Sequence, residues 1–143
     1  MSAIRLARPM VDTPFQINMA WWERNRRDFM TFLRESSCPG CLSRFPLDAP
    51  LGEADYIDAE TGEVRRLNDL WACIVEECAP APGYIAPDLP IATAIFRALV
   101  SRGNVPLTPL QIHDIIQRSN PQTILRVLTG PTAILGILPV TSS

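Results

Sequence analysis

The chain has 143 residues, of which 47% are hydrophobic, and it carries a formal net charge of −2 with a pI near 5.3. This length and composition indicate one domain, or two small ones, with a real hydrophobic core, and they exclude global disorder. The acidic pI argues against a broadly basic nucleic-acid-binding surface but leaves room for a local basic patch. All 13 basic residues are arginine.

The sequence offers no sign of membrane insertion or secretion. Its apolar runs are far shorter than the roughly 18 residues of a membrane span. The N-terminus contains arginines but no apolar segment typical of a signal peptide. We therefore expect a cytoplasmic protein.

The N-terminal part divides into an arm and a helix. Residues 1–15 show no periodicity and are expected to form an arm. Residues 16–36 are predicted to form one amphipathic helix with an aromatic face in the core. An alternative use of this helix is a nucleic-acid or partner surface that combines Trp21 or Trp22 with its arginines. Those arginines are Arg24, Arg26 and Arg27.

A cysteine pair follows this helix. Cys38-Pro39-Gly40-Cys41 is expected to form a tight turn that points two sulfurs at one place, and it resembles a zinc knuckle. Structural zinc takes four ligands in a tetrahedron. The predicted metal site therefore consists of all four cysteines of the chain, which are Cys38, Cys41, Cys73 and Cys78. His113, the single histidine, is an alternative fourth ligand.

The next elements are a loop over residues 42–53, a β-hairpin over 54–66 with a turn at Glu60-Thr61-Gly62, and a helix over 67–78. The order of knuckle, hairpin and helix resembles a treble-clef zinc finger. In that family the second ligand pair lies in the first turn of the helix, whereas Cys73 and Cys78 come late.

The spacing of Cys73 and Cys78 leaves the state of the cysteines open. Five residues rotate an α-helix by about 140°, so the helix would have to unwind before Cys78 for both sulfurs to share one site. Zinc, reduced or buried thiols, and a disulfide all remain possible. A thioredoxin-like redox motif is disfavoured, because such a motif follows a strand and opens a helix.

The C-terminal part is expected to follow a proline-rich linker at residues 79–88. It contains a helix over 89–103 and two short helices within 108–130. The first of these two helices is expected to start with Thr108 as N-cap, Pro109 at the first helical position and Gln111 completing a capping box. The second is expected to start in the same way, with Asn120 as N-cap and Pro121 at the first helical position. Residues 132–140 are expected to form a small wing or a strand that packs on the hairpin.

The paired short helices resemble a helix-turn-helix, of the winged-helix kind, over residues 88–140. The resemblance implies that the second helix enters the major groove of DNA. Gln122, Thr123 and Arg126 would then read bases, while Arg118 and Ser119 would touch phosphates. The turn departs from the usual pattern, because residues 117–120 contain no glycine.

Enzymatic activity is not expected. His113 lies in an apolar helix without a visible catalytic partner, and the chain has no glycine-rich phosphate loop. The predicted fold is mainly α with a small β-hairpin, divided into residues 1–15, 16–78, 79–88 and 89–143. The predicted function is a DNA-binding, transcription-associated protein with structural zinc. The alternative is a non-enzymatic protein-interaction module that forms a homodimer.

Overall fold

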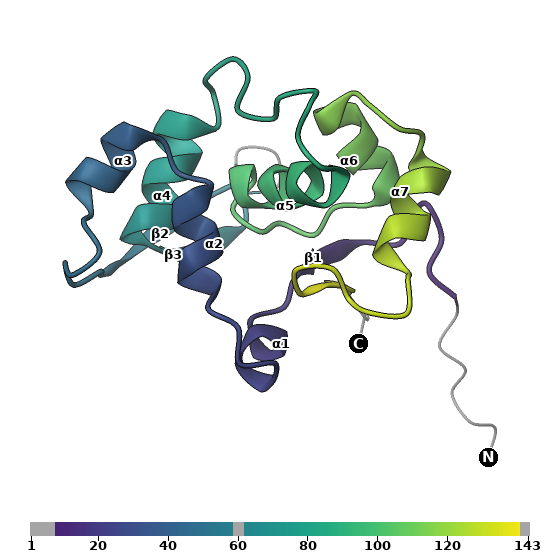
Figure 1. Ribbon diagram of the computed structural model, residues 1–143, viewed down its shortest axis with the longest axis horizontal. Helices are drawn as coiled ribbons and strands as arrows, with labels where there is room; N and C mark the ends of the chain where they lie inside the picture. Colours follow the sequence, from purple (N-terminus) through teal and green to yellow (C-terminus); the bar gives the residue numbers. More distant parts are fainter. Residues whose placement is uncertain (1–7, 59–61, 141–143) are drawn as a thin grey trace.

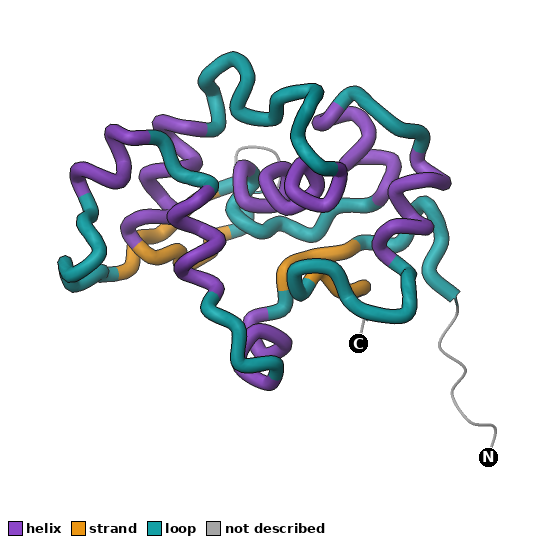
Figure 2. The backbone as a smooth tube through the Cα atoms, in the orientation of Figure 1, coloured by secondary structure: helices purple, strands orange, loops and turns teal. Residues whose placement is uncertain are grey.

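The structure is a computed structural model that describes residues 8–58 and 62–140 (Figure 1). Within these ranges the fold is mixed, with seven α-helices, one π-helical turn and two separate two-stranded antiparallel sheets (Figure 2). In chain order the elements are β1 (Phe15–Ile17), α1 (Met19–Arg24), α2 (Phe29–Glu35), α3 (Pro39–Arg44), β2 (Glu53–Ile57), β3 (Val64–Asn68), α4 (Asp69–Cys73), η1 (Ile74–Cys78), α5 (Ile91–Ser101), α6 (Pro109–Ile116), α7 (Pro121–Leu128) and β4 (Ile137–Pro139).

The single helix predicted over residues 16–36 is wrong. The segment forms β1 and then two short helices, because it contains two N-caps. The side chain of Asn18 accepts a hydrogen bond from Trp21 N at 3.0 Å, and that of Asp28 accepts one from Met30 N at 3.0 Å. Between the two helices the chain reverses at Arg26, whose φ is 53°. Capping side chains thus outweigh a continuous apolar pattern.

The predicted loop over residues 42–53 is also partly wrong. Cys38 is the N-cap residue of α3, and Pro39 occupies the first helical turn, where a missing N–H costs nothing. The cysteine pair therefore starts a helix instead of forming an isolated knuckle. Arg34 fixes the end of α3, since its Nη1 donates to the carbonyl oxygen of Phe45 at 2.8 Å.

The β-hairpin is confirmed as β2 and β3, with Asp55 opposite Arg66 and Ile57 opposite Val64. Glu60 and Thr61, two residues of the predicted turn, lie outside the described residues. Gly62 has a φ of 73°, the left-handed conformation expected for the glycine of that turn.

The helix predicted after the hairpin is confirmed as α4 with η1, and the three C-terminal helices are confirmed as α5, α6 and α7. The capping box of α6 is present between Thr108 and Gln111. In the turn before α7, Gln117 and Ser119 adopt φ values of 57° and 60°. Two non-glycine residues therefore provide the left-handed geometry that glycine usually supplies.

Residues near the two ends of the chain pair in the second sheet. β4 runs antiparallel to β1, with Ile17 opposite Ile137, and not against the hairpin as one of the two alternatives had it. β1 also forms a bridge to Leu107, through Phe15 N to Leu107 O at 2.8 Å. The strand that follows α7 is thus held by the start of the chain.

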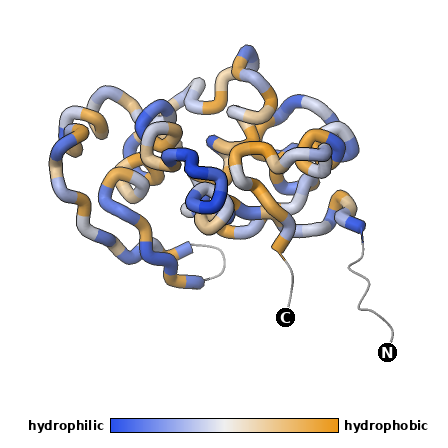
Figure 3. Tube along the Cα trace, turned by 60° about the horizontal axis from the view of Figure 1, so that its bottom comes forward, coloured by the Kyte–Doolittle hydropathy of each residue, from blue (hydrophilic) through white to orange (hydrophobic). Residues whose placement is uncertain are grey.

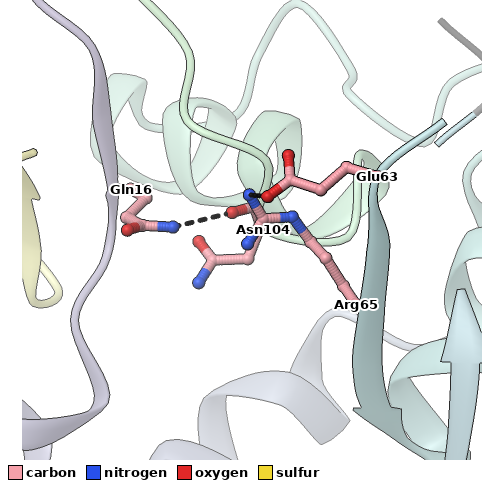
Figure 4. A network of polar contacts seen from close by, with 4 residues as sticks. All are labelled: Gln16, Glu63, Arg65 and Asn104. Atoms are coloured by element: carbon pink, nitrogen blue, oxygen red, sulfur yellow. Dashed lines mark hydrogen bonds and ion pairs between the residues drawn. The ribbon is translucent and has the colours of Figure 1, made fainter. Parts of the chain in front are cut away.

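Asn104 joins the α5–α6 connection to β1. Its side chain accepts from Ile17 N at 2.8 Å and donates to Ile17 O at 2.9 Å, which imitates a strand partner. Gln16 Nε2 donates to Asn104 O at 3.0 Å, and Figure 4 shows this contact beside the Arg65–Glu63 ion pair of the hairpin. Asn104 has a φ of 65°, which asparagine tolerates better than most residues.

α5 is the centre of the hydrophobic core. Ala94, Ile95, Ala98 and Leu99 have no exposed surface, and the other elements surround this helix (Figure 1). An aromatic group packs between α5 and the N-terminal helices, and it consists of Trp22, Phe29, Phe32, Trp71 and Phe96. The buried residues form one cluster that includes both sides of the 79–88 segment. The proposed subdomain boundary there stays a prediction.

Helices long and apolar enough to span a bilayer are absent from the part of the chain that the structure describes.

Candidate metal centre

All four cysteines meet where α3 packs against α4 and η1. The sulfurs of Cys38, Cys41 and Cys78 lie within 4.8 Å of one another, and the Sγ atoms of Cys78 and Cys41 are 3.5 Å apart. Cys73 joins them through Cys41, since the two form a disulfide with a Cα–Cα distance of 6.0 Å. Cys41, Cys73 and Cys78 are buried, and Cys38 is half-buried.

A π-helical turn lies between Cys73 and Cys78. Ala79 N donates to Ile74 O at 2.8 Å, a bond that spans five residues. This wider turn makes the rotation between residues five apart smaller than the about 140° of an α-helix, so Cys78 lies nearer to the side of Cys73 than it would in a regular α-helix. The helix does not unwind before Cys78, as a shared site would require of a regular α-helix, but widens instead. π-Helical turns of this kind often mark functional sites.

The start of α3 positions the other pair. Cys38 and Cys41 are three residues apart, so they share one face of the first helical turn. Leu42 N donates to Cys38 O at 3.1 Å, which closes that turn. The sequence motif thus directs two sulfurs to one place, as expected, through a helix start.

Two donors from the protein point at the sulfurs. The backbone N–H of Cys38 donates to Cys78 Sγ at 3.0 Å, and Arg44 Nη1 lies 3.6 Å from Cys73 Sγ. Donors around sulfur stabilise thiolates and metal-bound sulfur. Sequence analysis missed Arg44. Its position three residues after Cys41 on the same short helix is the signal that could have revealed it.

The two free thiols differ in acidity. A hydrogen bond with Cys78 lowers the pKa of Cys38, whereas burial raises the pKa of Cys78 to about 11. Beside them lies a cavity of about 240 Å³ that is also lined by Ser36, Tyr84 and Arg97. One side of the cluster is thus open to small molecules.

Among the alternatives considered for the cysteines, the structure contains the disulfide Cys41–Cys73 and leaves Cys38 and Cys78 as free thiols. His113 does not belong to the cysteine cluster, since its Nδ1 lies 2.6 Å from the carbonyl oxygen of Ser119. Three close cysteines can nevertheless bind a metal, and the fourth is covalently attached to one of them.

The residues expected to contact DNA lie on α7 and in the turn before it. Gln122 and Arg126 are exposed and four residues apart, so they form one stripe on α7. Thr123 is half-buried, and its backbone N–H is bound by the cap Asn120. The side chain of Arg118 lies against the segment that precedes α5, because its Nη1 donates to the carbonyl oxygens of Pro87 and Leu89.

Ser119 is half-buried, and its carbonyl is the group that contacts His113. The structure thus places Gln122 and Arg126 on one open surface, while Arg118 and Ser119 also connect parts of the fold. Comparisons with known proteins add nothing to these observations, since no protein family, curated protein or solved structure matches this chain.

Proposed function

We propose that this chain is a small, non-enzymatic, cytoplasmic DNA-binding protein whose fold is stabilised by one zinc ion on Cys38, Cys41, Cys73 and Cys78. The close approach of the Cys38, Cys41 and Cys78 sulfurs, with Cys73 bonded to Cys41, carries the zinc proposal. A zinc–sulfur bond of about 2.3 Å in a tetrahedron separates the sulfurs by roughly 3.8 Å. The 3.5 Å between Cys41 and Cys78 is near that value.

Zinc binding requires reduction of the Cys41–Cys73 disulfide by a cellular thiol reductant, which supplies two electrons and, with two protons, yields two thiols. In the cytoplasm thiols are kept reduced, so four thiolates would be available there. The backbone N–H of Cys38 and the guanidinium of Arg44 would then remain as donors to metal-bound sulfur.

Metal analysis of the reduced protein, purified without added metal, tests the zinc proposal. We expect about one zinc per chain and loss of that zinc in Cys78→Ser. His113→Ala serves as the control, because the same analysis should show unchanged zinc in this variant. A metal-free wild type with four titratable thiols would contradict the proposal.

The DNA proposal is supported by the two capped helices α6 and α7 and by the open stripe of Gln122 and Arg126. Both residue types read base edges in the major groove. We expect a duplex selected from a random pool to bind roughly 5- to 150-fold more weakly to Arg126→Ala. Arg66→Ala, which removes an exposed charge from the hairpin, should change the affinity little. Selection that enriches no duplex would contradict DNA binding.

A homodimeric interaction module is the second candidate function. It is favoured by Ile57 and Val64, a cross-strand pair beside the turn of the hairpin, which are 64% and 57% exposed. Contiguous exposed apolar surface is a feature of protein–protein contact sites. Sedimentation equilibrium should then show a dimer that dissociates in Val64→Asp. A monomeric wild type would contradict this function.

A further inference from the structure

A groove separate from the cysteines lies between α2, α5 and the segment that precedes β4. Its volume is about 470 Å³, which is in the range of small-molecule sites. Its apolar walls come from distant parts of the sequence. They include Phe32, Phe96, Ala133, Ile134 and Leu135.

Arg27 stands at the edge of this groove. Its guanidinium carbon lies 5.0 Å from the ring centre of Phe32, 5.4 Å from that of Trp22 and 5.6 Å from that of Trp21. Contact with the faces of aromatic rings orients a guanidinium without using its N–H donors. In the described ranges no carboxylate forms an ion pair with Arg27. The α1–α2 connection that contains it is strongly hydrophilic and lies beside the apolar segment leading to the C-terminus (Figure 3).

Two further charged residues line the groove. Arg97 donates from Nη1 to Tyr84 O at 2.8 Å and from Nη2 to Glu35 O at 3.2 Å. Its Nε is buried and finds no acceptor among the described residues. The third charge is the carboxylate of Glu35, so the lining carries one net positive charge at neutral pH. This combination of apolar walls, an oriented guanidinium and a positive balance complements an anion with an apolar body.

We propose that the groove binds a small amphiphilic monocarboxylate. The carboxylate would accept from the guanidinium of Arg27, and the apolar body would lie against Phe32, Phe96 and Leu135. This carboxylate site is distinct from the proposed zinc site and the proposed DNA-binding surface, because no cysteine and no residue of α7 lines the groove. Its failure would therefore leave both earlier proposals unaffected.

Octanoate is the probe, titrated calorimetrically into the full chain. We expect saturable binding of one octanoate per chain with a Kd below about 1 mM. Acetate lacks the apolar body and octylamine lacks the negative charge, so both should bind at least tenfold more weakly. Methyl shifts in NMR spectra should place octanoate near Ala133 and Thr93, which line the groove.

Two variants test the residue assignment. Arg27→Gln should weaken octanoate binding at least tenfold, because it removes a charged donor. The matched control is Arg24→Gln, which removes an exposed arginine at the end of α1 that does not line the groove. Ala133→Trp should block the groove sterically without changing its charge, and circular dichroism should show that each variant is folded.

Four results would overturn the proposal. The first two are the absence of saturable octanoate binding and equal octanoate affinity in Arg27→Gln and Arg24→Gln. The third is octylamine binding as tight as octanoate binding. The fourth is acetate affinity equal to that of octanoate, because the apolar walls would then contribute nothing.

Discussion

Arg44 places a positively charged side chain beside the cysteine cluster. Four thiolates around one divalent zinc leave an excess of negative charge in a largely buried place. Arg44 Nη1, at 3.6 Å from Cys73 Sγ, offers the opposite charge to that sulfur. Partners of metal ligands typically change metal affinity by 10- to 100-fold when they are removed.

Arg44→Ala is therefore expected to weaken zinc binding by about tenfold, measured by competition with a chelator of known affinity. Arg66→Ala is the control, since it removes the same charge from the exposed face of the hairpin, away from the sulfurs. Equal zinc affinities in the two variants would show that Arg44 acts only through the overall electrostatic potential of the protein and not through its contact with Cys73.

Gly136 is a second residue with a specific role, because it lets the turn before β4 approach α1. Its φ is 70°, and an added Cβ would lie 2.5 Å from Trp22 Nε1. A side chain at this position would both strain the backbone and collide with a buried ring.

We expect Gly136→Ala to lower the free energy of unfolding by about 2–4 kcal/mol, measured by urea denaturation. Gly130→Ala is the matched control, because the nearest atom to an added Cβ there is 3.9 Å away. Equal stabilities of the two variants would mean that the turn relaxes freely and does not constrain Trp22.

At the scale of elements, the geometry of the α4–η1 helix determines the relative positions of Cys73 and Cys78. Its first half is α-helical and starts at the cap Asn68, which accepts from Trp71 N at 2.8 Å. Its second half widens into η1, which reduces the rotation between Cys73 and Cys78 relative to a regular α-helix. Single π-helical turns of this kind are rare and occur frequently at functional sites.

Insertion of one alanine after Glu77 is expected to move Cys78 to a spacing of six residues from Cys73, which corresponds to a rotation of about 240° in an α-helix. Cys78 would then lie on a different side of the helix, and zinc content should fall to that of Cys78→Ser. Glu77→Ala keeps the spacing and should retain zinc. Normal zinc in the insertion variant would show that the spacing of Cys73 and Cys78 is not needed for the site.

At the scale of the whole molecule, the cysteine cluster connects α3 to α4 and η1, while the β1–β4 sheet connects residues near the two ends of the chain. α5 packs between these regions and shares contacts with η1, α6 and β1. Loss of the proposed zinc should therefore destabilise the whole fold, because both halves share one core.

Removal of zinc with a strong chelator is expected to lower the Tm by roughly 10–20 °C. This estimate assumes free zinc at about 1,000 times its Kd, and readdition of zinc should restore the Tm. Differential scanning calorimetry measures the change, and Cys78→Ser should be insensitive to the chelator. An unchanged Tm in the wild type would mean that the cysteines do not stabilise the fold through a metal.

The sequence by itself determined the features that depend on neighbouring residues. The hairpin, α5, and the starts of α6 and α7 follow from local periodicity, caps and proline positions, which act within a few residues. The motif from Cys38 to Cys41 likewise predicted two sulfurs at one place, although through a tight turn and not through the helix start that the structure contains.

Only the tertiary structure decided the features that depend on distant residues. The pairing of β1 with β4 required the fold to bring residues 120 positions apart into register, as for Ile17 and Ile137. The caps at Asn18 and Asp28 that divide the predicted N-terminal helix are local by contrast, and the continuous apolar pattern concealed them. The widening of η1, which packs against α3, could not be predicted from the sequence, since five-residue spacing in an α-helix separates the cysteines. Long-range packing therefore turned four cysteines in two distant pairs into one cluster.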